Sequence, residues 1–219
     1  MEPQFWLNRW RNGQIGFHQS SIDRSLQRYW PKLELGPSRG RVFVPLCGKS
    51  LDLLWLRDQG HVVTGVELSA AALEAFCMEN GIPARRRIRD DFDVYEAANL
   101  ELFRGDFFKL TATSLGETAA VYDRAAVISW TPELRSSYAD HIAALIRPRT
   151  PMLLIALEYP QAQMPGPPFS IPPDEMDRLY SQNFAIREIG RQDILQSETR
   201  LRSSGVTSLF EVCYHLVRK

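Results

Sequence analysis

The sequence predicts an α/β protein with a doubly wound, mostly parallel sheet, and one stretch near its start carries that prediction. Arg41–Leu46 (RVFVPL) is a short apolar run rich in valine and phenylalanine, which is typical of a buried strand. Leu51–Leu56 (LDLLWL) has apolar residues at helical spacing and is followed by Gly60 as a stop signal. His61–Glu67 (HVVTGVE) is a second β-branched strand. Strand, helix and strand in this order form a βαβ unit with parallel strands.

Length and composition fit a single globular domain over residues 1–219, with 44% apolar and 24% charged residues. The 26 basic and 26 acidic residues cancel, which argues against nucleic acid as the main partner. No apolar run reaches the roughly 18 residues of a membrane helix, and no signal peptide is evident, so we expect a cytoplasmic protein. Cys47, Cys77 and Cys213 lack CxxC spacing, which favours a reducing compartment and no metal site.

The turn after the first strand and the end of the second predict a ligand site. Ligands of open α/β sheets lie at the carboxyl ends of the strands, where Leu46, Cys47 and Gly48 would meet Glu67. A carboxylate about 20 residues after such a turn can accept hydrogen bonds from both hydroxyls of a ribose. The pattern therefore predicts an adenosine-containing cofactor. The alternative is a purely structural βαβ unit in which Glu67 caps the next helix.

Two phosphate-binding motifs are absent from this turn. Gly48-Lys49-Ser50 resembles the end of a phosphate loop, but Phe43 stands where that pattern requires its first glycine. There is no GxGxxG, so a pyrophosphate would find no glycine-lined approach to the helix. A nucleoside cofactor without phosphates is favoured over a dinucleotide.

The first 30 residues are rich in aromatic side chains, unlike a disordered tail. The aromatic residues are Phe5, Trp6, Trp10, Phe17, Tyr29 and Trp30. Trp6 and Trp10 share one face if the segment is helical. We interpret residues 1–30 as a lid over the cofactor crevice, where aromatic faces would attract a cation and exclude water. A helix docked permanently on the core is the alternative.

Downstream, helical and strand patterns alternate as a doubly wound sheet requires. We expect helices over Ala70–Asn80, Thr131–Ile146 and Asp174–Tyr180, and strands over Val94–Ala97, Leu100–Arg104, Ala119–Asp123, Met152–Glu158, Ala185–Gly190 and Leu209–Val217. Ala84–Asp93 has the composition of a solvated, charged loop. The six prolines from Pro160 to Pro173 predict an extended functional loop.

Two further strand ends place polar residues at the same edge. Asp106 and Phe107 follow the third parallel strand, where they could meet the amino group and the ring of an adenine. A capping aspartate and a core phenylalanine are the alternative. Arg124 ends the fourth strand, and from its position alone it is a surface or helix-start residue.

These residues also carry a family resemblance over nearly the whole chain. The motifs FW, GQIGFHQS, VFVPLCGKSLDLLWL, HVVTGVELS, GDFF, YDRAA and PGPPF resemble the thiopurine S-methyltransferases, above all their bacterial members. The resemblance implies a class I S-adenosylmethionine-dependent methyltransferase fold with an antiparallel C-terminal strand. It further implies methyl transfer to the sulfur of aromatic and heterocyclic thiols, with selenium and tellurium compounds as possible further acceptors in bacterial relatives.

The resemblance also assigns expected roles to individual residues. It implies that S-adenosyl-L-methionine is held by Trp10, Phe17, Leu46, Gly48, Glu67, Asp106, Phe107 and Arg124. Arg124 and Arg200 are implied as the catalytic pair, contacting the methionine carboxylate or an anionic acceptor. His18, Asp23 or water could take the proton of the thiol, and the sequence leaves this choice open.

Two other functional classes compete with this interpretation. A nucleotide-dependent oxidoreductase would need the missing glycine fingerprint, and a non-catalytic Rossmann-like domain would not need to keep Trp10, Glu67 and Arg124 together. We therefore expect a monomeric enzyme that acts on a small-molecule thiol, without a membrane or nucleic-acid partner.

Overall fold

The computed structural model describes residues 3–35 and 40–219, and within these ranges nine strands form one continuous sheet. The order across the sheet is β3-β4-β5-β2-β1-β6-β7-β9-β8. The strands are β1 (Arg41–Val44), β2 (Val62–Glu67), β3 (Arg85–Arg89), β4 (Phe92–Ala97), β5 (Leu100–Arg104), β6 (Ala120–Arg124), β7 (Pro151–Glu158), β8 (Phe184–Asp193) and β9 (Phe210–Arg218).

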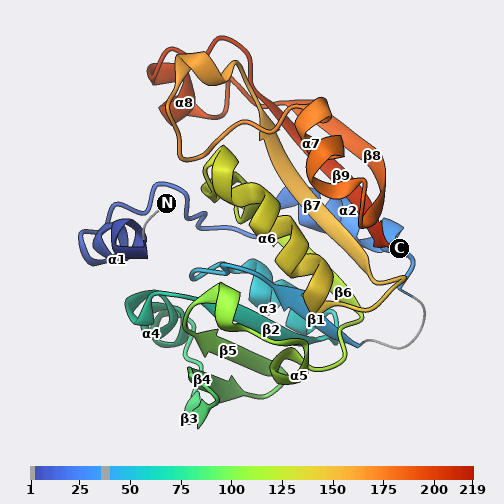
Figure 1. Cartoon of the computed structure of the whole chain (residues 1–219). Helices are drawn as coiled ribbons and strands as arrows, with labels where there is room; N and C mark the ends of the chain where they lie inside the picture. Colours follow the sequence, from blue (N-terminus) through green and yellow to red (C-terminus); the bar gives the residue numbers. More distant parts are fainter. Residues whose placement is uncertain (1–2, 36–39) are drawn as a thin grey trace.

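Helices cover both faces of the sheet and give three layers (Figure 1). The α-helices are α1 (Pro3–Arg11), α2 (Arg24–Tyr29), α3 (Asp52–Asp58), α4 (Ala70–Glu79), α5 (Ala112–Leu115), α6 (Pro132–Leu145), α7 (Pro173–Tyr180) and α8 (Thr199–Ser203). Single 3₁₀ turns occur at η1 (Trp30–Leu33), η2 (Phe107–Lys109), η3 (Val127–Ser129) and η4 (Gln161–Gln163). None of the helices in the described part of the chain is long and apolar enough to span a bilayer.

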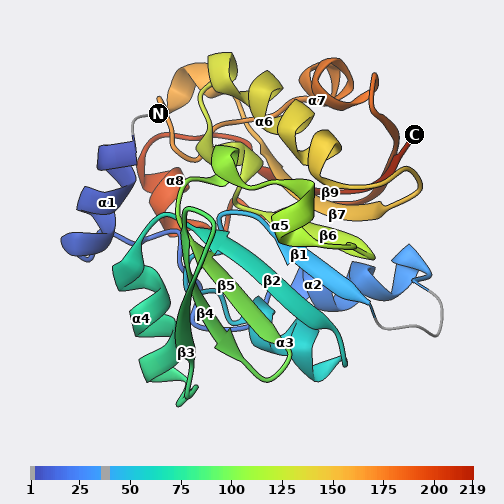
Figure 2. The same ribbon diagram turned by 60° about the horizontal axis from the view of Figure 1, so that its bottom comes forward.

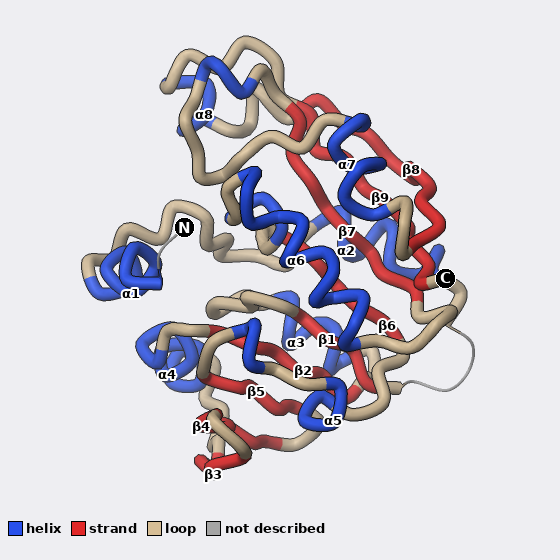
Figure 3. The backbone as a smooth tube through the Cα atoms, in the orientation of Figure 1, coloured by secondary structure: helices blue, strands red, loops and turns tan. Residues whose placement is uncertain are grey.

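The five central strands run parallel, as the sequence predicts. β1 pairs with β2 on one side and with β6 on the other, β2 pairs with β5, and β6 pairs with β7. All five carboxyl ends therefore meet at one edge. The segments around α1 and α8 lie on the same side of the molecule (Figure 3).

Two cores sandwich this sheet because its central strands are apolar on both faces. On one face, α6 and α7 bury residues such as Tyr138, Ile142 and Met176 against the sheet. On the other, α2, η1, α3 and α4 bury Leu26, Phe76 and their neighbours. The amino end of α4 is fixed by Ser69, the predicted cap, whose hydroxyl accepts from the backbone nitrogen of α4 residue Ala72 at 3.3 Å.

The two strands from the C-terminal part of the chain, β8 and β9, add antiparallel pairs to one edge of the sheet. β9 inserts between β7 and β8, antiparallel to both. The expected antiparallel final strand is confirmed, and β8 joins it at the outer edge. Because β9 runs opposite to β7, its first residues lie beside the last residues of β7, so that Glu211 pairs with Leu157. An antiparallel strand thus brings its amino end to the ligand edge.

The expected loop over Ala84–Asp93 is wrong, because Arg85–Arg89 forms strand β3 and pairs with β4 at the far edge of the sheet (Figure 2). Its arginines are paired rather than merely solvated. Arg87 Nε lies 2.7 Å from Glu96 Oε2, and Arg89 Nη2 lies 3.0 Å from both Glu96 Oε1 and Glu101 Oε1. The charge run therefore stabilises an edge strand.

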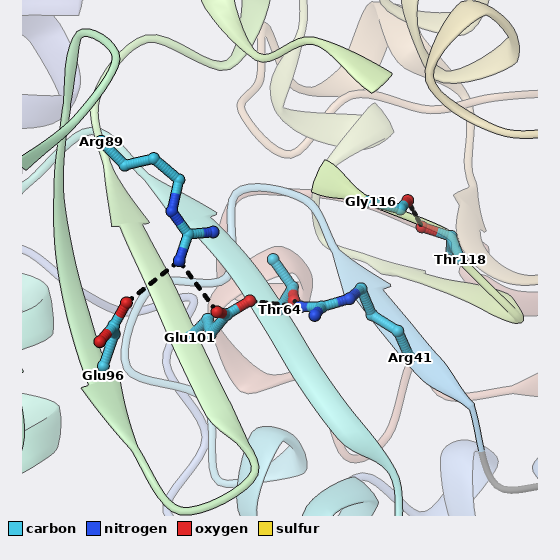
Figure 4. Close-up of polar contacts among 7 residues, drawn as sticks. All are labelled: Arg41, Thr64, Arg89, Glu96, Glu101, Gly116 and Thr118. Carbon is cyan, nitrogen blue, oxygen red and sulfur yellow. Dashed lines mark hydrogen bonds and ion pairs between the residues drawn. The ribbon is translucent and has the colours of Figure 1, made fainter. Parts of the chain in front are cut away.

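Glu101 links this hairpin to the parallel part of the sheet. Its carboxylate lies between Arg89 and Arg41, and Arg41 also donates to the hydroxyl of Thr64 (Figure 4). Burial opposes ionisation of Glu101, but the two guanidinium groups outweigh it and lower its pKa. The result is a row of polar contacts that runs across β4, β5, β2 and β1.

Candidate functional site

A cavity of about 510 Å³ opens at the carboxyl edge of the parallel strands. Ligand pockets of open α/β sheets occur at this edge. All nine residues expected to bind cofactor or acceptor line it: Trp10, Phe17, Leu46, Gly48, Glu67, Asp106, Phe107, Arg124 and Arg200. Residues from both ends of the chain thus meet at one cavity.

The turn after β1 forms the floor of the cavity. Leu46 and Gly48 have positive φ angles, of 47° and 54°, which turn the chain sharply back beneath the cavity. Glycine adopts this conformation freely, whereas a leucine is strained there. Cys47 lies buried beneath the turn, and its backbone nitrogen donates to Val66 O at 3.0 Å. A β-carbon on Gly65 would lie 2.6 Å from Cys47 Sγ, so β2 can pass under the turn only as glycine.

Glu67 ends β2 directly beside this turn and is only 7% exposed. Its carboxylate accepts from the backbone nitrogen of Gly48 at 3.0 Å and from that of Ser69 at 2.8 Å. Burial raises the pKa of Glu67, while these backbone donors act in the opposite direction. Ser69 rather than Glu67 caps α4. Glu67 therefore lines the cavity with its carboxylate oriented by two backbone donors, and it is not the N-cap of α4.

Asp106 and Phe107 bound the cavity at the end of β5. Asp106 caps the η2 turn by accepting from Phe108 N at 3.0 Å. The Phe107 ring packs against Tyr138 and His141, at centroid distances of 5.0 and 4.8 Å. The structural alternative drawn from the sequence, a capping aspartate and a core phenylalanine, is confirmed. Both residues also line the cavity, and their contact with an adenine stays a prediction.

Arg124 reaches the cavity from the end of β6, where a buried network orients it. Its Nε donates to Asp23 Oδ2 at 3.1 Å, and Asp23 caps α2 through Leu26 N at 2.9 Å. The Asp23 backbone nitrogen donates to Asp52 Oδ1 at 2.8 Å, and the Tyr122 hydroxyl donates to Asp52 Oδ2 at 2.9 Å. The expectation from position alone, a surface arginine, is wrong because Arg124 is largely buried, with 15% of its side chain exposed.

This network keeps the guanidinium charged and partly free. Burial works against the charge, but the acidic neighbours Tyr122, Asp52 and Asp23 outweigh it and raise the pKa of Arg124. No residue within 3–35 or 40–219 accepts a hydrogen bond from its two Nη groups. Those groups are available to an anionic ligand in the cavity.

Asp23 and His18, both considered as proton acceptors, have different environments. Asp23 is 4% exposed, and its two carboxylate oxygens are occupied by Arg124 and Leu26, so it does not line the cavity. His18 does line it. Burial and the charges of Lys49 and Arg124 lower the pKa of His18.

The N-terminal segment forms one wall of the cavity. Trp6 and Trp10 lie on α1 and both contact the Phe17 ring, at centroid distances of 5.7 and 5.5 Å. A β-carbon on Gly48 would lie 3.1 Å from Trp10 Cζ2, so the indole sits directly on the turn after β1. Residues 1–2 of the expected lid lie outside the described residues.

The opposite end of the cavity comes from the C-terminal third of the chain. Its lining is mostly apolar, with Ile155, Leu157, Pro167, Pro168, Ile194 and Leu201. Arg200 lies on α8, and its Nη2 donates to Pro167 O at 3.2 Å. This contact joins α8 to the proline-rich loop.

Sequence reasoning missed two acidic residues that line this end, Glu198 and Glu211. Glu211 is the only acidic residue within β9, and this is the one sequence signal that could have identified it. Asp123, although adjacent to Arg124, lies on the other face of β6 and accepts from the hydroxyl of Tyr138 at 2.7 Å. It is not part of the cavity lining.

Comparison with known proteins gives the family. The thiopurine S-methyltransferase family model matches residues 1–219. A thiopurine S-methyltransferase of Nitrosospira multiformis is 44% identical over 219 residues, covering 100% of this chain and 99% of the relative. One of Methylococcus capsulatus is 42% identical over 217 residues, covering 99% and 97%.

Solved structures share the fold at low identity. A SAM-dependent methyltransferase from Anabaena variabilis aligns with a TM-score of 0.67 and 15% identity, covering 99% of this chain and 95% of that one. A 1,6-didemethyltoxoflavin-N1-methyltransferase from Burkholderia thailandensis, with bound S-adenosylhomocysteine, aligns with a TM-score of 0.63 and 14% identity, covering 99% and 87%. This chain belongs to the thiopurine S-methyltransferase family and is an S-adenosylmethionine-dependent methyltransferase.

Proposed function

We propose that this protein transfers the methyl group of S-adenosylmethionine to the sulfur of an aromatic or heterocyclic thiol of the thiopurine kind. The observation that carries the proposal is a single cavity with two chemically different ends. Glu67 and the turn after β1 line one part of it, the apolar wall of the C-terminal third lines another, and Arg124 lines it as well. Relatives at 42–44% identity that bear the name thiopurine S-methyltransferase support the acceptor class.

The residues at the first end fit the cofactor. Each Glu67 oxygen accepts one backbone hydrogen bond and keeps a free lone pair, which suits the two ribose hydroxyls. Gly48 lets the chain approach closely because a β-carbon there would meet Trp10. Asp106 and Phe107 would take the adenine. The free Nη groups of Arg124 would take the methionine carboxylate.

When bound, the cofactor supplies a methyl group already activated on a sulfonium sulfur. The chain then has to align the acceptor and exclude water. The apolar residues Ile155, Leu157 and Pro168 would hold an aromatic ring, and Trp10 and Phe17 would close the cavity from the N-terminal side. Alignment of this kind contributes up to about 7–11 kcal/mol to a displacement. A dry cavity also favours a reaction in which thiolate and sulfonium charges cancel.

Arg124 and Arg200 differ in how they would act on the acceptor. Arg124 donates through Nε to Asp23, which leaves its two Nη groups to bind the ligand. Arg200 is exposed and tied to Pro167 at the mouth of the cavity. We therefore assign Arg124 to cofactor and thiolate stabilisation and Arg200 to the recruitment of anionic acceptors. A selenol, being softer and more acidic than a thiol, would use the same alignment, and we propose it as a further acceptor class.

An acceptor screen with the purified protein tests the proposal. We would measure S-adenosylhomocysteine formation with a thiopurine, an aryl thiol, the matching phenol, an aryl selenol and tellurite. Methylation of the thiols but not of the phenol is expected, because the oxygen analogue is a harder and less acidic nucleophile. Turnover of the phenol at the same rate, or of no thiol despite tight S-adenosylhomocysteine binding, would contradict the thiol assignment.

Calorimetric titration separates the other classes of function. S-adenosylhomocysteine should bind, and NAD and ATP should not, because the turn after β1 has no glycine-lined pyrophosphate site. The Glu67→Ala variant is the matched control for the cofactor end of the cavity. Tight binding of NAD would instead favour an oxidoreductase.

A further inference from the structure

Glu211 stands alone among the acidic residues of the cavity in having a buried structural partner and a free oxygen. Its Oε1 accepts from the hydroxyl of Ser25 on α2 at 2.5 Å. No described residue donates to its Oε2, and the side chain lines the cavity beside Leu157. One oxygen of this cavity-lining carboxylate is therefore anchored, and the other has no donor among the described residues.

The surroundings of Glu211 suit a proton acceptor. Burial raises its pKa, and the nearby carboxylates of Asp23 and Glu198 act in the same direction. The Ser25 hydroxyl and the Arg124 guanidinium oppose this shift. A carboxylate with a raised pKa is a better match for a thiol than an ordinary one, because general-base catalysis improves as the base strengthens.

The other candidates lack one of these properties. Asp23 does not line the cavity, and its two carboxylate oxygens accept from Arg124 and Leu26. His18 lies on the N-terminal side of the cavity, where the positive charges of Lys49 and Arg124 help to lower its pKa and weaken it as a base. The carboxylate of Glu198 has no hydrogen-bond or ion-pair partner within 3–35 or 40–219, and only its backbone is bonded, to Ile194 and Arg202.

We propose that Glu211 is the general base that removes the proton of the bound thiol. This rests on the proposed thiol-methyltransferase function. Glu211 Oε2 takes the S–H proton, and the sulfur electron pair forms the bond to the methyl carbon. The bond from that methyl to the sulfonium sulfur breaks, and its electron pair stays on that sulfur. The products are the methyl thioether and S-adenosylhomocysteine, and neutral Glu211 then gives its proton to water.

The proposal implies that weakly acidic acceptors enter the cavity as neutral thiols and are ionised inside it. A thiolate formed next to Arg124 is stabilised by that charge, whereas a free thiolate approaching Glu211 and Glu198 meets two carboxylates. Thiol acidity should therefore decide how much the enzyme depends on Glu211.

The test compares Glu211→Gln with wild type on two aryl thiols that differ in acidity and carry no other ionisable group. Glutamine keeps the shape and can still accept from Ser25, but it cannot take a proton. With the weakly acidic thiol below its solution pKa, kcat/KM should fall by about 10²-fold. With the strongly acidic thiol, already ionised at the assay pH, the loss should stay below about threefold. The Kd of S-adenosylhomocysteine should not change.

Two further variants serve as controls for the Glu211→Gln measurement. Glu188→Gln neutralises an exposed carboxylate of β8 that lies outside the cavity, and it should match wild type with both thiols. Ser25→Ala removes the hydrogen bond that favours ionised Glu211, so the acidic limb of the pH–rate profile should move to higher pH. This second variant tests the proposal even if Glu211→Gln does not fold.

Three outcomes would overturn the proposal. An equal loss with both thiols would mean that Glu211 only positions the acceptor. No loss with either thiol, or an acidity-dependent loss in His18→Gln instead, would place the base elsewhere. Failure of wild type to methylate either thiol, with S-adenosylhomocysteine binding intact, would contradict the thiol-methyltransferase function itself, which separates the two proposals.

Discussion

At the scale of single residues, Glu67 makes the clearest prediction, because its carboxylate is already oriented by backbone donors from Gly48 and Ser69. Glu67→Ala should weaken S-adenosylhomocysteine binding by roughly ten- to a hundredfold, which corresponds to about 1.5–3 kcal/mol for a charged hydrogen-bond partner. Calorimetry measures the affinity, and circular dichroism confirms that the variant is folded. An unchanged Kd in a folded variant would rule out this role.

The Arg124→Ala and Arg200→Ala variants are predicted to affect different kinetic constants. Arg124 is fixed by Asp23, so Arg124→Ala should lower both kcat and cofactor affinity, and lysine should rescue it only in part because a point charge cannot reproduce the planar fork. Arg200→Ala should mainly raise KM for anionic thiols, by about tenfold at most, since the side chain is exposed.

Steady-state kinetics with one anionic and one neutral thiol distinguishes these effects. The contact between Arg200 and Pro167 adds a structural role that the sequence did not indicate. If Arg200→Ala raises KM for both acceptors equally, its role is to hold the proline-rich loop in place, and the assignment to acceptor recruitment is wrong.

At the scale of elements, we predict that α1 opens readily in the free protein and closes over the cavity when the ligand binds. None of the residues of α1 is buried. Trp10 packs on Gly48 and on the Phe17 ring, and α1 also lies against α4. A segment with so little buried surface opens at low free-energy cost. Amide hydrogen exchange over residues 3–20 should therefore slow when S-adenosylhomocysteine binds.

The exchange of α6 provides an internal reference, since it packs into the core and should be protected with or without ligand. Equal protection of residues 3–20 in both states would identify α1 as a permanently docked helix. That outcome would also assign Trp10 and Phe17 to a static wall.

The sequence predicted the buried central strands well, and it did not predict the charged edge strand or the shortest helices. The central strands β2 and β7 are buried on both faces, so their continuous apolar runs marked them to within about one residue. β3 is an edge strand whose arginines are exposed, and a charged edge strand has the composition of a loop. The helices α2 and α8, with six and five residues, are too short to show helical periodicity.

At the scale of the whole molecule, the same reasoning explains what was predicted of the site. Leu46, Glu67, Asp106 and Arg124 follow parallel strands, and all such strands end at one edge, so their convergence was predictable. Glu211 begins an antiparallel strand, and its position at that edge follows only from the pairing of β9 with β7. Predicting that Glu211 lies at the cavity would have required the order of the strands in the sheet, which the sequence does not give.

Asp123 makes a prediction about the stability of the whole fold. Burial raises its pKa to about 6, even though Tyr138 and Val127 donate to the carboxylate. The folded pKa lies above the unfolded value near 3.8, so the stabilising contribution is complete below that value and is lost as the pH rises through about 6. The loss amounts to up to about 3 kcal/mol.

Comparison with Asp123→Asn isolates this contribution from that of other carboxylates, such as Glu101, whose lowered pKa acts in the opposite direction. Urea unfolding from pH 4.5 to 7.5 should show wild type losing stability relative to the variant as the pH rises. A difference between the two proteins that does not vary with pH would contradict the raised pKa.

The environment of the cysteines, above all of Cys47 beneath the turn after β1, determines how reactive their thiols are. Cys47 lies against Gly65 inside the cavity lining, and burial together with the charge of Glu67 raises its pKa well above the usual range of a thiol. Burial also raises the pKa of Cys213, to about 12, and that of Cys77. Only thiolates attack disulfides. All three thiols are therefore shifted toward the protonated form, so Cys47, Cys77 and Cys213 are weaker nucleophiles toward a disulfide than an ordinary exposed cysteine.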